Sequence, residues 1–356
     1  LESRRDSLKN IVFQADLGSV FDKTERVAAI AEYLANEMGA QPKLARRAAE
    51  LSKSDLVTDM VGEFDDLQGV MGRDYALNDN EDSEVAKALF EQYLPRFSGD
   101  IVPNTDTGVA LALADRLDSL IGIFSIGQQP SGSRDPFALR RASLGVLRIM
   151  LERNIDLNLV DVLSYCNAQL NIGKRAKLSG TELEKQVLTY TLERFKSWYK
   201  EKGLPAEVFL SVAALKLGNP LDIDARVTAV HRFTLLPEAS SLAAANKRVS
   251  NILTKQLAHS DIAALNTALL QEEAEKQLSD SLNSLETLIA PLLANRDYNA
   301  VLEKLAELKQ PVDQFFEDVM VMAEDMELRQ NRLALLDKLH KLFINVADIS
   351  LLVPAK

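Results

Sequence analysis

The stretch Thr107–Phe124, TGVALALADRLDSLIGIF, is apolar at most positions and is interrupted mainly by Asp115, Arg116 and Asp118. It contains no proline and no run of β-branched residues, and its apolar side chains recur at helical spacing. A helix of this composition has to bury most of its surface. We therefore expect Thr107–Phe124 to pack inside a bundle of helices.

The flanking sequence has the same helical period. Glu25–Ala40, Glu84–Leu94 and Pro136–Asn154 each combine an apolar face with a polar one, and signals for strands are almost absent. Gly39, Gly99 and Gly127 stand where helices should end. The pattern predicts an all-α fold, with five to seven helices before about residue 150.

Helical patterns continue to the end of the chain. The breaker cluster KLGNPLDIDARV, Lys216–Val227, contains a capped restart and marks a candidate boundary. We predict a first helical domain over 1–153, a helical linker region over 154–219, and a second helical bundle over 220–356.

Composition restricts the class of protein. The 356 residues are 47% hydrophobic and 26% charged, which is typical of a globular protein in water. No run of about 18 apolar residues occurs, so we expect no membrane span. The formal net charge of −11 argues against indiscriminate binding to polyanions, and any nucleic-acid contact must use local basic patches. Cys166, the single cysteine, cannot form an intramolecular disulfide and is expected to be a buried structural thiol.

Residues for catalysis are sparse. The three histidines, His231, His259 and His340, all lie beyond residue 230 and have no cysteine or paired carboxylate at ligand spacing. No G-x-S-x-G element and no GxxxxGK[ST] loop occurs. We therefore predict no catalytic residue and no metal site in this chain.

Asp115 and Asp118 are the exception among the carboxylates, because they are three residues apart on one face of an apolar helix. They could coordinate a metal or pair with cations of a neighbouring helix. Arg140 and Arg141 are near in sequence, so we favour structural ion pairs of Asp115 and Asp118 with these two arginines.

The stretches KTERVAAIAEYLA, AAELSKSDL and ALADRLDSL together resemble an HD-type helical domain. Members of that family with phosphohydrolase activity hold a metal with a histidine, a His-Asp pair and a later aspartate. Lys23 stands at the first histidine, Ser52 and Lys53 replace the His-Asp pair, and only Asp115 matches. The resemblance implies an HD-like domain that has lost its metal site.

Longer strings resemble a different and more specific family. SKSDLVTDMVGEFDDLQGVMGRDYA, VAKALFEQYLPRFSGD, IGQQPSGSRDPFALRRASLGVLRI, LAAANKRVSNIL and FFEDVMVMAEDMELRQNRLALLDKL closely resemble the β subunits of the bacterial two-subunit glycyl-tRNA synthetases. The resemblance covers essentially the whole chain and identifies it as the C-terminal half of such a subunit.

This resemblance implies a division of labour. The α subunit of such an enzyme carries the active site that uses ATP and Mg²⁺, and the β subunit contributes tRNA binding and assembly. The implied partners are a glycine-specific tRNA and the α subunit, in an assembly of two α and two β subunits in the cytoplasm. No cofactor is implied for this chain. The bundle over 220–356 is expected to be of the anticodon-binding, DALR-like type.

Binding to RNA requires cations for phosphates and planar or amide groups for unstacked bases. Two segments offer such groups, and a solvated helix face paired with local acids is the alternative for both. The candidate residues are Asn246, Lys247, Arg248 and Asn251 in the first segment, and Arg329, Asn331 and Arg332 in the second.

The loop IGQQPSGSRDPFALRRA, Ile126–Ala142, places Asp135 as a helix N-cap and Pro136 as the first helical residue. Such capping favours an ordered turn over an anion site. We expect Arg134 and the loop to face tRNA or a protein partner.

Two other functions remain open from the sequence. The chain could be an HD-type phosphohydrolase, although positions 23, 52 and 53 lack the ligands that such an enzyme needs. It could also be a purely structural helical interaction module.

Overall fold

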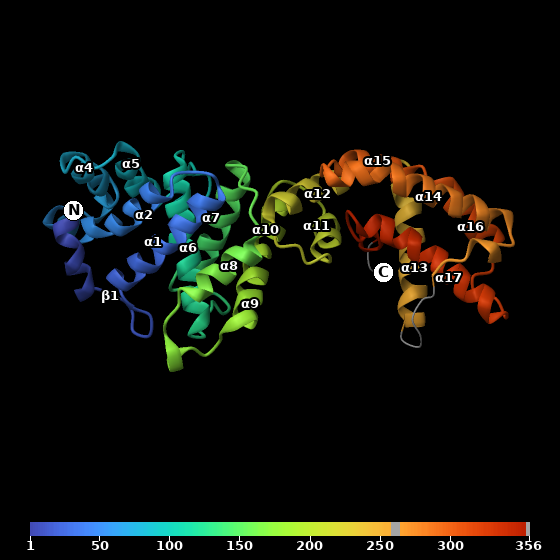
Figure 1. The fold of residues 1–356 in the computed structure, drawn as a ribbon, viewed down its shortest axis with the longest axis horizontal. Helices are drawn as coiled ribbons and strands as arrows, with labels where there is room; N and C mark the ends of the chain where they lie inside the picture. The colour runs from blue at the N-terminus through green and yellow to red at the C-terminus, as the bar shows by residue number, and fades with distance from the viewer. Residues whose placement is uncertain (258–263, 354–356) are drawn as a thin grey trace. The chain divides into compact units, whose positions relative to one another are not determined.

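A computed structural model describes residues 1–257 and 264–353, and the described chain is almost entirely helical (Figure 1), which confirms the predicted all-α fold. It divides into two compact units. Unit 1 contains Leu1–Phe195 and Gly218–Leu221, and unit 2 contains Lys196–Leu217 and the described residues from Asp222 onward.

Unit 1 contains nine complete α-helices and one small hairpin. The α-helices are α1 (Val20–Glu37), α2 (Pro42–Leu51), α3 (Asp59–Glu63), α4 (Val70–Asn78), α5 (Ser83–Glu91), α6 (Asp106–Ser125), α7 (Leu139–Glu152), α8 (Leu159–Ala168) and α9 (Gly180–Leu192). Its shorter elements are the 3-10 helices η1 (Glu2–Asn10), η2 (Ser54–Val57), η3 (Asp65–Leu67) and η4 (Gly173–Arg175), and the strands β1 (Val12–Gln14) and β2 (Gly18–Ser19).

The helix α10 (Arg194–Glu201) begins in unit 1 and continues into unit 2. Its successors are α11 (Ala206–Ala213), α12 (Pro220–Phe233), α13 (Ala239–Leu257), η5 (Thr267–Leu269), α14 (Glu273–Ala294), α15 (Tyr298–Ala306), α16 (Lys309–Asp318), α17 (Met326–Ile344) and η6 (Ile349–Leu352).

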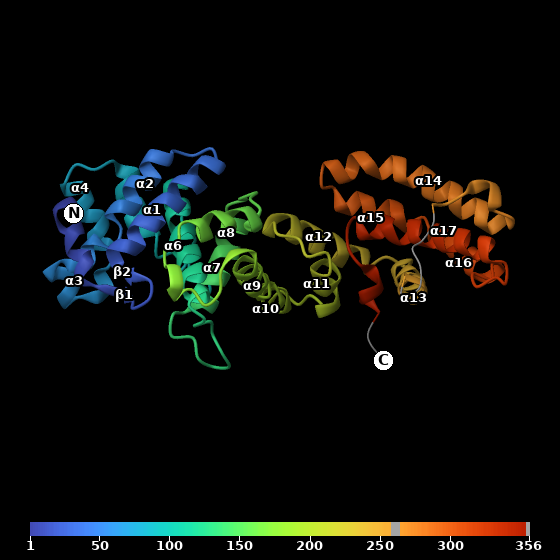
Figure 2. The same cartoon turned by 60° about the horizontal axis from the view of Figure 1, so that its bottom comes forward.

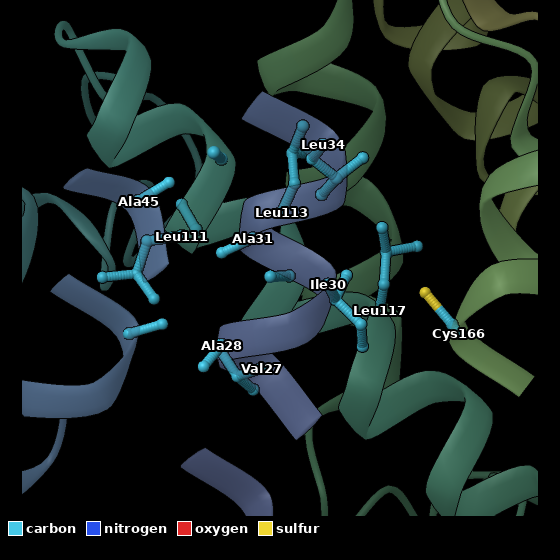
Figure 3. Close-up of a cluster of buried hydrophobic side chains, with 14 of the residues drawn as sticks. Val27, Ala28, Ile30, Ala31, Leu34, Ala45, Leu111, Leu113, Leu117 and Cys166 are labelled. Atoms are coloured by element: carbon cyan, nitrogen blue, oxygen red, sulfur yellow. The ribbon is translucent and has the colours of Figure 1, made fainter. Parts of the chain in front are cut away.

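The helix α6 is the centre of unit 1. It packs against α1, α2, α5, α7, α8 and α9, and most of its side chains are buried, as its nearly continuous apolar sequence requires. Figure 3 shows Leu117 of α6 beside Ile30 of α1 with the thiol of Cys166 nearby, and Leu111 and Leu113 of α6 around Ala31 of α1. Cys166 is buried, as predicted, and burial raises the pKa of its thiol well above the usual range.

The start of α6 is fixed by side chains from α5 and from its own N-cap. Thr105 accepts a hydrogen bond from the amide of Gly108, and the carboxylate of Glu91 accepts hydrogen bonds from the amides of Asn104 and Thr105. A Cβ atom at Gly108 would lie 1.9 Å from Oε2 of Glu91. The close approach of α5 to α6 therefore requires glycine at position 108.

Arg116 of α6 holds the turn that follows α5. Its Nη1 donates to the carbonyl of Gln92 at 3.1 Å, and its Nη2 donates to the carbonyls of Tyr93, Leu94 and Pro95 at 3.3, 2.7 and 3.2 Å. Burial lowers the pKa of Arg116 to about 10, and the carboxylate of Asp115 partly opposes that shift. One guanidinium thus satisfies four carbonyls that would otherwise lack a helical partner.

Unit 2 is held by buried aromatic rings and by one arginine that spans several elements. The ring centroids of Phe233 and Phe343 are 6.5 Å apart in its core. Arg226 of α12 donates to Oδ2 of Asp222 at 2.8 Å, to the hydroxyl of Tyr298 at 2.8 Å and to the carbonyl of Asn345 at 2.6 Å. These bonds join α12 to the start of α15 and to the end of α17.

Several local expectations differ from the structure. The helix α7 begins at Leu139, three residues after Pro136, although Asp135 does cap it by accepting hydrogen bonds from the amides of Leu139 and Arg140. The preceding loop forms an isolated bridge between Ser131 and Arg134 and projects from the helices (Figure 2). The pairing of β1 with β2 is a hairpin that the helical period did not predict.

The predicted linker over 154–219 is not a separate body. The helix α8 packs against α6 and α9, and the amide of Leu159 donates to the carbonyl of Gly218 at 2.9 Å. The part of the predicted linker up to Phe195 therefore belongs to unit 1. The helix α11 belongs to unit 2, because the amide of Asp348 donates to the carbonyl of Ser211. Within the described residues, no helix is both long and apolar enough to cross a membrane.

We expect Arg116→Met to lower the free energy of unfolding of unit 1 by about 3–5 kcal/mol, because buried carbonyls lose their donor. Hydrogen exchange of the α6 amides under increasing denaturant measures unit 1 alone. The control is Arg46→Met, because Arg46 is exposed and, within residues 1–257 and 264–353, pairs with Glu32 and Glu50 alone, so its loss should cost less than about 1 kcal/mol. Equal effects of the two substitutions would contradict this role for Arg116.

Candidate functional site

The residues at the degenerate HD positions lie together in unit 1. Nζ of Lys23, on α1, is 3.2 Å from Oδ1 of Asp115, and Nζ of Lys53, in the turn before η2, is 3.5 Å from Oδ2 of the same carboxylate. Lys23 and Lys53 are buried, with 5% and 9% of their surfaces exposed. Two ammonium groups therefore hold the two oxygens of the one carboxylate that matches the HD pattern.

The neighbouring carboxylate is also paired. Asp118 accepts hydrogen bonds from Nζ of Lys23 at 3.1 Å and from Nε and Nη2 of Arg26 at 2.6 and 3.1 Å. Lys23 further donates to the hydroxyl of Ser119 at 2.8 Å. We call Lys23, Arg26, Lys53, Asp115 and Asp118 the charge cluster, in which three cations surround two anions.

Burial and charge act in opposite directions on the titration of this cluster. Burial alone would raise the pKa of Asp115, but the charges of Lys23, Lys53 and Arg116 outweigh it and hold that pKa well below its usual range. Burial lowers the pKa of Lys53, and Asp115 partly restores it. The Asp115 carboxyl is therefore ionised at neutral pH and is compensated by its own neighbours.

The charge cluster does not fit a divalent metal. Mg²⁺ and similar cations require several oxygen or imidazole donors, whereas positions 23 and 53 place ammonium groups against the only matching carboxylate. The hydroxyl of Ser52 donates to the carbonyl of Ala49 inside its own helix. Throughout the described part of the chain, no group of three or more His, Cys, Asp or Glu side chains could hold a metal ion.

The expected pairing of Asp115 and Asp118 with Arg140 and Arg141 is wrong. Arg140 donates instead to the carbonyl of Gly132 in the loop, and Arg141 is exposed. The reason is the fold. The helix α1 and the turn after α2 place Lys23, Lys53 and Arg26 against these two carboxylates, which therefore already have partners. Arg134 is exposed in the projecting loop, which leaves its predicted contact with tRNA or a partner open.

Three of the predicted RNA contacts are buried in unit 2. The side-chain nitrogen of Asn246 donates to the carbonyl of Leu242 within α13. Asn331 exchanges two hydrogen bonds with the backbone of Asn266, at 2.7 and 3.0 Å. Arg332 is 5% exposed and donates to the fully buried carboxylate of Glu275 at 2.6 Å. Burial and these partners make Asn246, Asn331 and Arg332 structural residues, contrary to the prediction of RNA contact.

The other four predicted contacts remain accessible to different extents. Arg248 and Asn251 are exposed on α13, three residues apart on one helical face. Lys247 is half-buried and donates to the carbonyl of Val353, and Arg329 is half-buried with its guanidinium against the sulfur of Met326. Of this set, Arg248 and Asn251 are the most available to a ligand.

The sequence reasoning missed the ring beside Arg248. The guanidinium carbon of Arg248 lies 4.3 Å from the ring centroid of Phe316, which is on α16. Met320 and Met322 follow in the connection to α17, and Met326 is the first residue of α17; their exposed fractions are 75%, 51% and 58%. The string FFEDVMVMAEDM could have signalled this surface, because aromatic and methionine side chains rarely gather in an exposed segment without a partner. We call Arg248, Asn251, Phe316 and these three methionines the α13–α16 surface.

The two described histidines, His231 and His340, belong to no group of side chains that could hold a metal ion. His231 and His340 are half-buried, and the Nδ1 atom of each is buried without a hydrogen-bond partner among the described residues. His259 lies outside the described residues.

Comparison with known families decides the affiliation of the chain. The family model described as the glycyl-tRNA synthetase beta subunit matches residues 1–214. The chain belongs to the glycyl-tRNA synthetase β subunit family. A second model, the DALR anticodon binding domain, matches residues 242–350, which include α13, α16, α17 and the α13–α16 surface. The predicted family and the predicted anticodon-binding type of the second bundle are thus confirmed.

Curated β subunits are similar to this chain over its whole length. The glycine–tRNA ligase beta subunit of Marinobacter nauticus is 53% identical over 355 residues, which is 100% of this chain and 50% of that protein. Those of Chromohalobacter salexigens and Pseudomonas aeruginosa are 52% and 50% identical over 98% and 99% of the chain and cover 50% and 51% of those proteins. The chain spans about half the length of these relatives.

The charge cluster should make a pH-dependent contribution to stability. Asp115→Asn removes the ion-pair partner of Lys53 and leaves Lys23 with Asp118 alone, and we expect a loss of about 3–5 kcal/mol at pH 7. Because the folded-state pKa of Asp115 is lowered, its contribution is complete above the unfolded value of 3.8 and is lost as the pH falls through the folded value.

Hydrogen exchange of the α6 amides, measured for both proteins from pH 7 downward, should show a constant difference that shrinks below pH 3.8. Asp106→Asn is the control, because Asp106 is an exposed residue of α6 whose one ion pair among the described residues is with Arg153, at 3.4 Å. A difference for Asp115→Asn that does not depend on pH would show that the carboxylate charge is not what stabilises unit 1.

Proposed function

We propose that this chain is the tRNA-binding and assembly portion of the β subunit of a glycine–tRNA ligase. In this proposal ATP and Mg²⁺ are used at the active site of a partner α subunit, and this chain supplies no cofactor ligand. The assembly contains two α and two β subunits and acts in the cytoplasm. Family membership and the anticodon-binding type of unit 2 support this assignment.

The observation that carries the RNA-binding part is the α13–α16 surface. The guanidinium carbon of Arg248 lies over the ring of Phe316, 4.3 Å from its centroid, so a planar cation is held against an aromatic ring at the surface of unit 2. Unstacked RNA bases bind to such planes, and phosphates bind to such charges. Asn251 adds amide donors and acceptors on the same helical face.

The surrounding carboxylates do not cancel this surface. Asp313 accepts from Lys309 and Ser241, Asp318 accepts from Gln314, and Asp325 caps the start of α17. Within the described residues no carboxylate forms an ion pair with Arg248, which therefore retains its charge for an external anion. The exposed Met320, Met322 and Met326 supply apolar surface in the same unit that can adapt to bases of different shape.

The lysines of the charge cluster argue against an HD-type phosphohydrolase, because the metal that such a reaction needs has no ligand set at positions 23, 52 and 53. A purely structural module differs from our proposal in one measurable property. Binding of tRNA through phosphates weakens steeply with added salt, whereas a structural module would show no such binding.

We expect Arg248→Gln to weaken binding of glycine-specific tRNA about tenfold. It should also reduce the slope of the logarithm of the binding constant against the logarithm of salt concentration by about one, since one phosphate contact is lost. Phe316→Leu should weaken it by a similar factor with little change of salt slope, because it removes stacking support and no charge. Fluorescence anisotropy at several salt concentrations measures both quantities, for the chain alone and with the α subunit added.

The matched control is Arg232→Gln, which removes an exposed arginine from α12 of the same unit. It should leave the affinity within about twofold of the original, since it touches no part of the α13–α16 surface. A tRNA with an altered anticodon should bind more weakly than the natural one. Equal affinity of Arg248→Gln and Arg232→Gln for the natural tRNA would place its recognition elsewhere.

A further inference from the structure

Unit 1 contains a cavity of about 560 Å³ beside the charge cluster, within the ~300–1,000 Å³ usual for small-ligand sites. Its walls come from η3, the end of α5 and the following turn, the middle of α6, and the start of α7. Asp115 contributes to one wall, but its charge is compensated by Lys23 and Lys53. The described residues around the cavity therefore provide no metal ligand set.

Three residues that line the cavity, Gln92, Tyr93 and Asp115, each have a buried polar atom without a hydrogen-bond partner among the described residues, and only that of Asp115 has an ion-pair partner, Lys23. Nε2 of Gln92 donates to the carbonyl of Leu89 at 2.8 Å, which fixes the amide and leaves Oε1 as an unused acceptor. The hydroxyl of Tyr93 is likewise unpaired, and the ring of Tyr93 is held 4.2 Å from Nζ of Lys53. Gln92 is only 1% exposed, so its unpaired oxygen carries a desolvation cost that a bound donor would remove.

The remaining lining supplies flat apolar surface and positive charge. Phe90 and Phe137 are half-buried aromatic residues on the wall. Arg141 is exposed at the start of α7 and makes no hydrogen bond or ion pair within the described chain, whereas Arg96 already pairs with Asp100 at 3.0 Å. A ligand with a planar ring and one anionic group would match these walls.

We propose that this cavity binds a nucleotide, with its base among Phe90 and Phe137 and its phosphate at Arg141. An exocyclic amino group of the base donates to Oε1 of Gln92, and a ring nitrogen accepts from the hydroxyl of Tyr93. This function is additional to tRNA binding at the α13–α16 surface and does not rest on it.

The acids at the edge of the cavity restrict the ligand further. Asp65 and Asp66 of η3 are exposed and line the cavity. Their carboxylates can accept hydrogen bonds from ribose hydroxyls, and they repel a long polyphosphate. A nucleoside monophosphate, either free or at the unpaired end of an RNA chain, should therefore bind better than a triphosphate.

The test is titration of the full chain with AMP, GMP, CMP and UMP by isothermal calorimetry, with inorganic phosphate and ATP as comparison ligands. We expect at least one monophosphate to bind more tightly than either comparison ligand. Arg141→Gln and Gln92→Leu should each weaken that binding about tenfold, the usual scale for loss of a charge-assisted or buried hydrogen bond. Arg140→Gln is the matched control, because the adjacent Arg140 bonds to Gly132 and does not line the cavity.

Competition between the bound monophosphate and RNA hairpins distinguishes a free nucleotide from the end of an RNA chain as the ligand. Displacement of the bound monophosphate by an RNA hairpin with an unpaired 3′ end, but not by a blunt hairpin, would identify an RNA terminus. No displacement by either hairpin would identify a free nucleotide. The inference is overturned if no monophosphate binds at about 1 mM, far weaker than the affinities of dedicated small-molecule sites, or if binding is unchanged in both Arg141→Gln and Gln92→Leu. Arg248→Gln should leave monophosphate binding intact, which separates this inference from the proposed tRNA interface.

Discussion

The carboxylates of Asp115 and Asp118 project from a helix that is otherwise buried among apolar side chains, and an uncompensated charge at that depth would cost several kcal/mol. Lys23, Arg26 and Lys53 are the compensation, and each comes from an element that must be docked on α6 to supply it. The requirement for neutrality thereby fixes α1 and the turn after α2 against α6. It also consumes the oxygens that a metal would need. The same ion pairs therefore stabilise unit 1 and leave these two carboxylates unsuited to a metal.

Unit 2 also contains a buried charge that is compensated by a partner from another helix. Arg332 of α17 and Glu275 of α14 form a buried ion pair, and Arg332 also donates to the carbonyl of Met320 at 2.9 Å. The second bond orients the connection before α17, where the exposed methionines lie. Arg332 is thus a structural residue, whereas Arg248 is exposed, although the sequence alone does not distinguish the two.

Local features were predictable because their causes lie within a few residues. Apolar periodicity predicted the helices, and the capping role of Asp135 followed from its place before a helical run. Ion-pair partners were not predictable from proximity in sequence. Arg140 is 25 residues from Asp115 but turns to Gly132, whereas Lys23 is 92 residues away and reaches α6 through the packing of α1. Only the family resemblance had placed positions 23, 53 and 115 at one site.

The proposed RNA contacts also depend on ion-pair partners that are distant in the sequence. A basic residue in an acidic protein is available to RNA only when its charge is not already used by a carboxylate of the chain, and a net charge of −11 makes such freedom uncommon. Arg332 and Arg248 each stand one or two residues after an asparagine in a helix, but Glu275, 57 residues distant, pairs with Arg332. Arg248 instead lies on Phe316, an uncharged ring that holds the guanidinium without neutralising it. A cation held by an aromatic face is ordered before RNA arrives and still carries its full charge, which is the combination that recognition of an unpaired base requires.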